Sequence, residues 1–267
     1  KERGAKLVAV CDCDEAVFSV ARKDYGLKEE QLFTDSASFF AKGKLADLLI
    51  VATTDRAHTE PSVRGMQLGY DILLEKPIAT SKEECGRIEA AAQKYRRRVI
   101  VCHVLRYSPF FRKIRELIEG GGFGKVVTVN HTENVGYWHF AHSFVRGNWR
   151  NEEESTFMLL AKCCHDLDIL VYLIGANCSA VSSMGEFSWF YPGNPEKGAD
   201  FCFECAKKDC PYNAEKFYLA NPLWVKVPAL PEEGRDEFIR SWVNRKENPY
   251  ARCVYACDND VVDHQIV

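Results

Sequence analysis

The sequence predicts an α/β fold, in which a doubly wound parallel sheet is followed by an α+β domain with an open, mostly antiparallel sheet. Short apolar runs alternate with helical segments as far as residue 104, and such alternation favours right-handed parallel crossovers. After residue 106 the pattern is less regular, with a glycine run at 120–122 and a strand-like alternation behind it. We therefore expect one domain over residues 1–106 and a second over residues 107–267.

The first domain is expected to contain five short strands of the buried type. They are Lys6–Cys11, Leu32–Phe33, Leu48–Ala52, Ile72–Leu74 and Val99–Val104. Helical spacing lies between them over Glu15–Tyr25, from Ser36, up to a stop at Gly69, and from Ser81 to about Arg96. Ser81 and Glu84 have the spacing of a helix-capping box.

Polar residues follow two of these strands directly. Thr53-Thr54-Asp55 comes after Leu48–Ala52, and Glu75-Lys76-Pro77 comes after Ile72–Leu74. Parallel sheets bind ligands at the carboxyl ends of their strands. A proline after Lys76 restricts the backbone there, which would help to place one cation in such a crevice.

The second domain is expected to mix helices with antiparallel strands. A helix opens at Ser108-Pro109 and runs to about Glu119, and Lys125–Thr132 alternates like a half-exposed strand. An aromatic loop follows, then a long helix over about Thr156–Ile174 that ends at Gly175. The apolar stripe expected to face the core consists of Leu160, Cys164, Leu167, Val171 and Ile174.

The remainder of that domain reads as a strand near Ala180–Phe187, a cysteine-rich insertion over about 188–234 and a short helix to about Val243. The chain ends in what reads as the middle of a strand at Val267, so we expect further sequence beyond it.

Composition excludes several classes of protein. The net charge of −3 gives no general attraction to nucleic acid or to an anionic membrane, and no apolar run has the length of a membrane helix. The first residues do not form a signal peptide. The 12 cysteines are therefore expected to be reduced thiols in a cytoplasmic protein.

Three of the cysteines are grouped closely. Cys202 and Cys205 have C-x-x-C spacing and Cys210 follows, so three thiolates of a zinc site are conceivable with another cysteine or a histidine as the fourth. Because the local sequence offers only three ligands, the default expectation is that no metal binds and that these thiols pack as small hydrophobes.

A dinucleotide-binding domain normally opens with a strand, a glycine-rich loop and a helix, and an acidic residue follows roughly 20 residues later to bind the ribose. Asp12 fits that acidic position, although it can also be a turn residue after a strand. Only eleven residues precede it, so we expect that the first strand and the glycine loop lie upstream of Lys1.

With the Glu75-Lys76-Pro77 triplet, the strand ending in Thr53-Thr54-Asp55 and the later His165-Asp166-Leu167-Asp168, the chain resembles the Gfo/Idh/MocA oxidoreductases. Stretches beginning at His103, His142, Ala161 and Cys210 carry the resemblance through the second half. It implies a Rossmann domain that binds NAD or NADP, a sugar, cyclitol or related polyol as substrate, and assembly into homodimers or homotetramers through the second domain.

The resemblance also assigns cofactor-binding residues. It implies that Asp12 contacts the adenosine ribose, that Thr53, Thr54 and His58 line the cofactor, and that Glu75, Lys76 and Pro77 lie beside the nicotinamide ribose, with a cis bond before the proline. Many members place an aspartate four residues before the helix histidine, and this sequence has Ala161 there. Lys162 is the neighbour that would take over part of that role.

The catalytic candidates are therefore Lys76, His165 and Lys162, with Asp168 placed to orient the imidazole of His165 or to bind substrate. Oxidation of an alcohol requires a group that takes the hydroxyl proton while hydride leaves, and histidine is suited to this near neutral pH. The alternative is a Lys162–Asp166 salt bridge along the helix beside a core histidine.

The substrate-side candidates mix rings and hydrogen-bond donors, as sugar sites do. They are His139, His142, Arg146 and Trp149 in the segment Tyr137–Trp149, and Arg106 near the domain junction. The alternative is a segment that packs over the junction without touching a ligand.

Three functions remain open from the sequence. The first is a dehydrogenase that transfers a hydride between nicotinamide and a sugar or polyol. The second is a glycoside hydrolase that oxidises its sugar transiently with no net change of the cofactor. The third is a non-enzymatic regulator that senses nucleotide.

Overall fold

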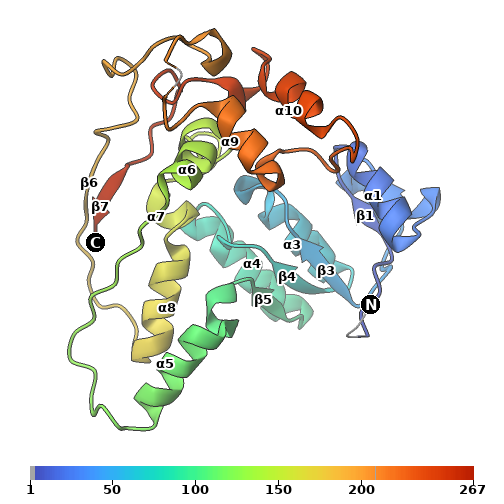
Figure 1. Cartoon of the computed structure of the whole chain (residues 1–267). Coiled ribbons are helices and arrows are strands. Elements are labelled where there is room, and N and C mark those ends of the chain that lie inside the picture. The colour runs from blue at the N-terminus through green and yellow to red at the C-terminus, as the bar shows by residue number, and fades with distance from the viewer. Residues whose placement is uncertain (1–3, 208) are drawn as a thin grey trace. The chain divides into compact units, whose positions relative to one another are not determined.

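The structure is a computed structural model, and it describes residues 4–207 and 209–267 (Figure 1). The chain divides into two compact units. The first comprises residues 1–101 and 221–239, and the second comprises residues 102–220 and 240–267. This division places the start of the second unit five residues before the predicted boundary, and it assigns part of the predicted insertion to the first unit.

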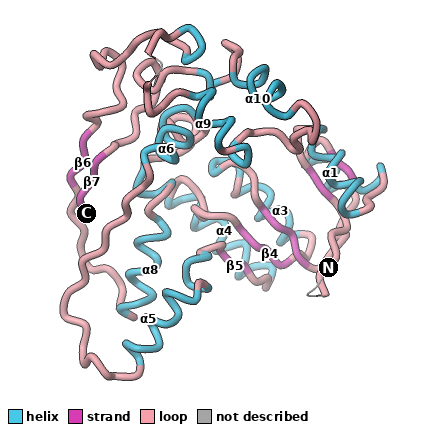
Figure 2. The backbone as a smooth tube through the Cα atoms, viewed as in Figure 1, coloured by secondary structure: helices cyan, strands magenta, loops and turns pink. Residues whose placement is uncertain are grey.

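The first unit alternates strands with helices, as predicted. Its elements are β1 (Val10–Cys11), α1 (Ala16–Tyr25), β2 (Leu32–Phe33), α2 (Ser36–Ala41), β3 (Leu48–Val51), α3 (Thr59–Gln67), β4 (Asp71–Leu74), α4 (Lys82–Tyr95) and β5 (Val99–Val101). β1 pairs with β2, and β3, β4 and β5 form a second sheet, with every pairing parallel. Figure 2 marks the strands in magenta and the helices in cyan. β1 is shorter than the predicted Lys6–Cys11, because only its last two residues have ladder partners in β2.

The residues predicted to end and begin helices do so. Gly26 closes α1 in the left-handed conformation with φ of 67°, which glycine adopts at little cost. Ser81 caps α4, since its hydroxyl accepts the N–H of Glu84 at 3.2 Å. The Glu84 carboxylate binds the hydroxyls of Thr80 and Ser81, so it completes the cap through side chains and not through the Ser81 N–H.

The main sheet of the first unit buries one face under α3 and α4 (Figure 1). Val51, Ile72 and Leu74 on that face pack against Met66 of α3 and Ile88 of α4. The residues between them point to the other face, where Leu48, Ile50 and Ile100 are exposed. The strands β3 and β4 are in register with Val51 opposite Leu74, so both deliver their following loops to the same edge.

The second unit contains mostly helices. They are α5 (Pro109–Glu119), α6 (Tyr137–Phe140), a π-helical turn (Ala141–Arg146), α7 (Met158–Ala161), α8 (Cys164–Ile174) and α9 (Ala214–Ala220), while α10 (Arg235–Val243) spans the boundary between the units. The predicted antiparallel sheet is present but small. It consists of β6 (Met184–Glu186) paired with β7 (His264–Ile266), and an isolated bridge joins Phe201 to Arg252.

Two predictions of local structure in this unit are wrong. Residues Lys125–Thr132 form no strand, because they pair with no other strand among the described residues, and Val127 is 89% exposed. The segment Tyr137–Trp149 is largely helical and not a loop, since α6 continues into the π-helical turn. Its apolar residues Phe140 and Phe144 enter the core, which explains why it folds regularly.

The predicted long helix is interrupted. α7 ends at Ala161, Lys162 has φ of −111°, and α8 begins after Cys163. The predicted core stripe is also wrong for α8, because Leu167, Val171 and Ile174 are exposed and the buried positions are Asp166, Ile169 and Leu173. This buried face carries the apolar side chains of Ile169 and Leu173, and Asp166 meets His131 on it.

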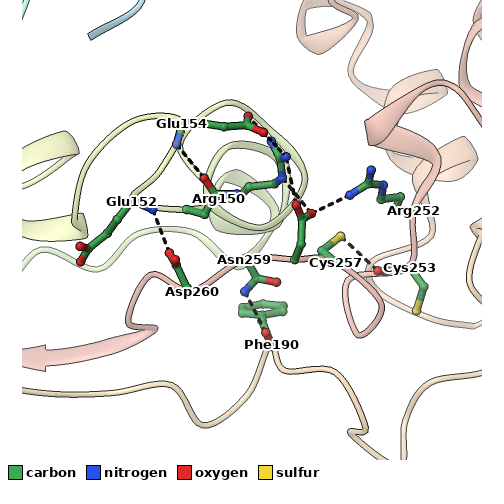
Figure 3. A network of polar contacts seen from close by, with 11 residues as sticks. Arg150, Glu152, Glu154, Phe190, Arg252, Cys253, Cys257, Asn259 and Asp260 are labelled. Atoms are coloured by element: carbon green, nitrogen blue, oxygen red, sulfur yellow. Dashed lines mark hydrogen bonds and ion pairs between the residues drawn. The ribbon is translucent and has the colours of Figure 1, made fainter. Parts of the chain in front are cut away.

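A polar network fixes two distant segments of the second unit to each other (Figure 3). Arg150 donates to the carboxylates of Glu154 and Asp258, and Arg252 also donates to Asp258. Beside it, the Glu152 N–H donates to Asp260 at 3.0 Å. These contacts hold residues 150–154 against residues 258–260, over the aromatic core that surrounds Phe140 and Tyr255.

No helix in the described part of the chain combines the length and the apolar character needed to cross a bilayer. All 12 cysteines lie within the described residues, and the structure contains each as a free thiol.

Candidate functional site

In the first unit, the ends of β3 and β4 carry the residues predicted to hold a cofactor. The Glu75 N–H donates to the Val51 carbonyl at 2.9 Å, which extends the sheet pairing into the Glu75-Lys76-Pro77 triplet. The Lys76–Pro77 peptide bond is cis, as the family resemblance implied. Lys76 is half-buried, and its own N–H donates to the Glu75 carboxylate at 3.3 Å.

His58 joins the loops that follow these two strands. Its Nδ1 lies 2.8 Å from the Pro77 carbonyl and its Nε2 lies 3.2 Å from the Thr53 carbonyl. The side chain is 0% exposed, so it offers no surface to a ligand. The geometry therefore favours a role for His58 in positioning both loops, in place of the cofactor contact that the resemblance implied.

The other cofactor candidates are accessible. Thr53 and Thr54 are exposed, and Thr54 precedes a short 3-10 turn over Asp55–Ala57. Asp12 follows β1, is half-buried, and accepts the N–H of Asp14 at 2.9 Å. That contact is the turn geometry considered from the sequence, and it leaves the second carboxylate oxygen of Asp12 for other donors.

In the second unit, Asp168 of α8 is held by Arg106. The guanidinium donates from Nε at 2.7 Å and from Nη2 at 2.6 Å, a bidentate arrangement. The hydrogen bond with Asp168 raises the Arg106 pKa and burial lowers it. The effect of the hydrogen bond is the larger, so the Arg106 pKa is raised. His103 approaches the same carboxylate, with Nε2 3.8 Å from Oδ1. Asp168 was predicted to orient His165 or to bind substrate. In the structure its carboxylate contacts Arg106 and His103.

Two further charge pairs surround the start of α8. His131 places Nε2 2.7 Å from the buried Asp166 carboxylate, and Lys162 donates to Glu133 at 2.7 Å. The predicted alternative of a Lys162–Asp166 salt bridge is wrong, because each residue has taken a partner from the segment 131–133. The break between α7 and α8 separates the two along the helix and allows this.

His165 lies among these pairs. Its ring meets that of His103 edge to face, with centroids 5.9 Å apart. It is half-buried at the second position of α8, directly before Asp166. The second unit therefore gathers eight side chains into one charged cluster around the start of α8: His103, Arg106, His131, Glu133, Lys162, His165, Asp166 and Asp168.

The four substrate candidates from the aromatic segment differ in their surroundings. His139 and Trp149 are partly buried beside Phe144. His142 is buried and binds the Tyr218 hydroxyl at 2.8 Å. Arg146 is 2% exposed and donates to the carbonyls of Tyr212 and Arg252. The contacts of His142 and Arg146 favour the alternative of packing, since neither side chain presents a surface to a sugar.

The sequence reasoning missed three members of the cluster, His103, His131 and Glu133. His103 lies two residues after β5, at the edge of the sheet where ligand-binding residues gather, but the predicted strand Val99–Val104 enclosed it. His131 and Glu133 had no usable signal, since they lie on a segment without regular structure and meet α8 only through the tertiary fold.

The comparisons with known proteins agree with both units. A family model described as an oxidoreductase family with an NAD-binding Rossmann fold matches residues 1–103. The model of the C-terminal alpha/beta domain of the same family matches residues 115–208.

Among curated proteins, YteT of Bacillus subtilis (strain 168), described only as an oxidoreductase, is 29% identical over 78% of this chain and 50% of its own length. The 2,7-anhydro-N-acetylneuraminate hydratase of Mediterraneibacter gnavus is 25% identical over 69% of this chain and 47% of its own. The chain thus spans about half the length of the curated relatives it matches.

Among solved structures, the WlbA dehydrogenase of Bordetella pertussis, in complex with NADH and UDP-GlcNAcA, has a TM-score of 0.53 and 26% identity. It is matched over 64% of this chain and 48% of that one. Myo-inositol 2-dehydrogenase of Lactobacillus plantarum, at 19% identity and a TM-score of 0.55 over 65% of this chain and 50% of that one, shares the fold.

Proposed function

This chain belongs to the Gfo/Idh/MocA oxidoreductase family, and from that premise we propose that it is a nicotinamide-dependent dehydrogenase of a sugar, cyclitol or related polyol. The observation that carries the proposal is the loop pair at the ends of β3 and β4, where His58 fixes Thr53 and the Lys76–Pro77 bond together. This is the edge at which parallel sheets bind their ligands.

The residues at this edge suit a dinucleotide. Thr53 and Thr54 offer exposed hydroxyls and backbone groups to a ribose or a phosphate, and Lys76 supplies a cation. Asp12 would bind the adenosine ribose and favour NAD over NADP, because a carboxylate repels a 2′-phosphate. When bound, the cofactor supplies or accepts the hydride.

The remaining chemistry falls to residues of this chain. Lys76 would orient the hydroxyl or carbonyl of the substrate, while His165 takes the hydroxyl proton in oxidation and returns it in reduction. Lys162 is the second candidate for this proton transfer, although its ion pair with Glu133 gives it a competing role. Arg106 would act on catalysis by holding Asp168 and, through it, the position of His103 beside His165.

On the substrate side, the partly buried His139 and Trp149 remain candidates to contact the ring of a sugar. His142 and Arg146 would support that surface from the core. We further propose that the complete protein acts in the cytoplasm as a homodimer or homotetramer.

The experiment is a turnover assay of the complete protein with NAD and a panel of sugars and cyclitols, which monitors NADH by absorbance. With a substrate in hand, Lys76→Ala and His165→Ala should each lower kcat by about 10²–10⁴-fold, the usual range for positioned acid–base groups. Binding of NADH, measured by fluorescence, should change little in His165→Ala. Lys113→Ala, on the exposed surface of α5, is the matched control and should retain full turnover. Unchanged turnover in Lys76→Ala would refute the assignment.

A second candidate function has a specific observation in its favour. A relative of this chain is named as a hydratase of an anhydro sugar, which is a reaction with no net oxidation. The same loops and histidines would then serve a transient oxidation followed by elimination or addition of water. The two functions separate in one assay: a dehydrogenase accumulates NADH in step with product, whereas the alternative forms product with a trace of NAD and no net NADH.

A further inference from the structure

Four cysteines of the second unit line one small cavity. They are Cys202, Cys205, Cys210 and Cys253, and they share its wall with Glu196, Lys207 and Tyr255. Three of them were grouped in the sequence, and the fourth comes from a segment some forty residues further along, by counting from Cys210 to Cys253. The structure thus supplies the fourth sulfur that the sequence alone did not.

Backbone pairing brings the fourth cysteine to the others. Phe201 and Arg252 form an antiparallel bridge, and the Cys253 N–H donates to the Asp200 carbonyl at 2.8 Å. Cys202 and Cys253 each follow a residue of that bridge. On the other side, a 3-10 turn closes Cys202 onto Cys205, whose N–H donates to the Cys202 carbonyl at 3.3 Å.

Each of the four sulfurs has an N–H donor. The Lys207 N–H donates to Cys205 Sγ at 3.4 Å, and the N–H groups of Tyr212 and Tyr255 lie against the sulfurs of Cys210 and Cys253. All three donors belong to the second residue after the cysteine. Donors of this kind stabilise a thiolate, as they do around metal ligands.

The fourth donor is a buried cation. Arg146 donates from Nη2 to Cys202 Sγ at 3.4 Å and is otherwise bonded to two backbone carbonyls. Within the described residues no carboxylate forms an ion pair with it. A guanidinium that is 2% exposed requires a compensating negative charge, and thiolates at this cavity would supply one.

A neighbouring cysteine shows the ordinary behaviour of a buried thiol. Cys257 donates its S–H to the Cys253 carbonyl at 3.3 Å, the contact that Figure 3 marks between the two residues. Burial raises the Cys257 pKa to about 12. Cys257 lies outside the cavity and is a packing thiol. Carbonyls also lie near one of the four cavity sulfurs, since Cys202 Sγ is 3.8 Å from those of Tyr212 and Arg252.

The backbone leaves room for these sulfurs. A Cβ on Gly198 would lie 2.5 Å from Cys205 Sγ, so any other residue at 198 would displace the sulfur or the loop. The loop is held over the cavity by Lys207, which donates to the carbonyl and the carboxylate of Glu196.

We propose that Cys202, Cys205, Cys210 and Cys253 bind one structural zinc ion through four thiolates. Within residues 4–207 and 209–267 no three histidine, cysteine or acidic side chains are already arranged to hold a metal ion. The proposal therefore includes a movement of the four sulfurs toward zinc on binding. Tetrahedral sites of this kind have Zn–S bonds of about 2.3 Å and leave no position for substrate. Binding forms four Zn–S bonds, releases the thiol protons to water and changes no oxidation state.

The test uses the complete protein, purified under reducing conditions and without chelator. Elemental analysis should find one zinc per chain. Cobalt reconstitution should give the charge-transfer absorption of a tetrahedral tetrathiolate. Cys205→Ser and Cys253→Ser should weaken zinc binding more than the about 10–100-fold that is typical when a residue that supports a metal ligand is changed. Cys257→Ser, which keeps a hydrogen-bond donor at the same depth, should retain zinc.

Alkylation of the cysteines in the unaltered protein tests the proposal even if a variant does not fold. In the unaltered protein, zinc should protect these four cysteines from iodoacetamide, as mapped by peptide mass spectrometry, and removal of zinc should expose all four together. Zinc content no higher than in Cys205→Ser, full retention of zinc in Cys253→Ser, or a disulfide between any two of the four would each overturn the proposal.

Discussion

The Arg106 guanidinium donates two hydrogen bonds to the Asp168 carboxylate, from Nε at 2.7 Å and from Nη2 at 2.6 Å. This bidentate contact fixes the face of α8 that carries His165. Arg106 also lies over the Tyr172 ring, so its plane is held on two sides. Lysine could replace the charge but neither the fork nor the stacking.

We therefore expect Arg106→Lys to lower kcat/KM by about ten- to a hundredfold, the scale of a catalytic group displaced by about 1 Å. The loss should fall on kcat more than on the binding of NADH, because the contact lies on the proton-transfer side. Steady-state kinetics and a fluorescence titration check this. Arg112→Lys, on the first turns of α5, is the control, and equal losses in the two variants would contradict the prediction.

His58 is expected to matter without touching a ligand. His58→Ala removes contacts to two carbonyls from a fully buried position, and each buried polar group left unsatisfied costs about 1–3 kcal/mol. Because the Thr53 and Pro77 loops then lose their common support, the Kd for NADH should rise. Urea unfolding and cofactor titration measure both effects. Glu60→Gln, on an exposed position of α3, should change neither, and a stable His58→Ala with normal NADH affinity would exclude the positioning role.

Gly147 closes the π-helical turn at a point where the backbone has no room for a side chain. A Cβ there would lie 2.8 Å from the His142 carbonyl and 3.0 Å from that of Ser143. Gly147→Ala should therefore lower the free energy of unfolding by about 1–3 kcal/mol, as overpacking does. Gly86→Ala in α4, where a Cβ meets nothing within 4 Å, should raise it by about 0.4–1 kcal/mol. Equal effects at the two glycines, measured by urea unfolding, would contradict this.

Asp258 should make the second unit sensitive to acid. Its hydrogen bond with Arg150 lowers the Asp258 pKa from 3.8 to about 2. A carboxyl group whose pKa is lower in the folded state stabilises the fold at every pH above its pKa in the unfolded chain. That stabilisation is lost as the pH falls from about 4 to about 2. Because the side chain is 55% exposed, screening by water limits the contribution to about 1 kcal/mol or less. Urea unfolding at pH 5 and pH 3 should show a smaller loss in Asp258→Asn than in the unaltered protein. Parallel losses would rule out this carboxylate as a source of the acid sensitivity.

The local signals of the first unit were sufficient to predict its elements. Alternating apolar runs, the Ser81 cap and the Gly26 stop act over a few residues, so they are readable without knowledge of the fold. The Glu75-Lys76-Pro77 triplet is also a local signal; together with the other motifs it indicated the family, and the family resemblance implied the cis bond. Lys125–Thr132 failed for the converse reason, because a strand exists only if another chain segment pairs with it.

By itself, then, the sequence determined the parallel first unit, the family and the candidate residues Lys76 and His165. Only the tertiary structure decided which groups the neighbouring charged side chains and thiols contact. It paired Asp168 with Arg106 and Asp166 with His131 across 62 and 35 residues, it buried His58 between two loops, and it brought Cys253 to the cysteines of residues 202–210. The physical reason is that a charge or a thiol takes the nearest compatible group in space. Spacing along the chain fixes that neighbour only within a helix or a turn.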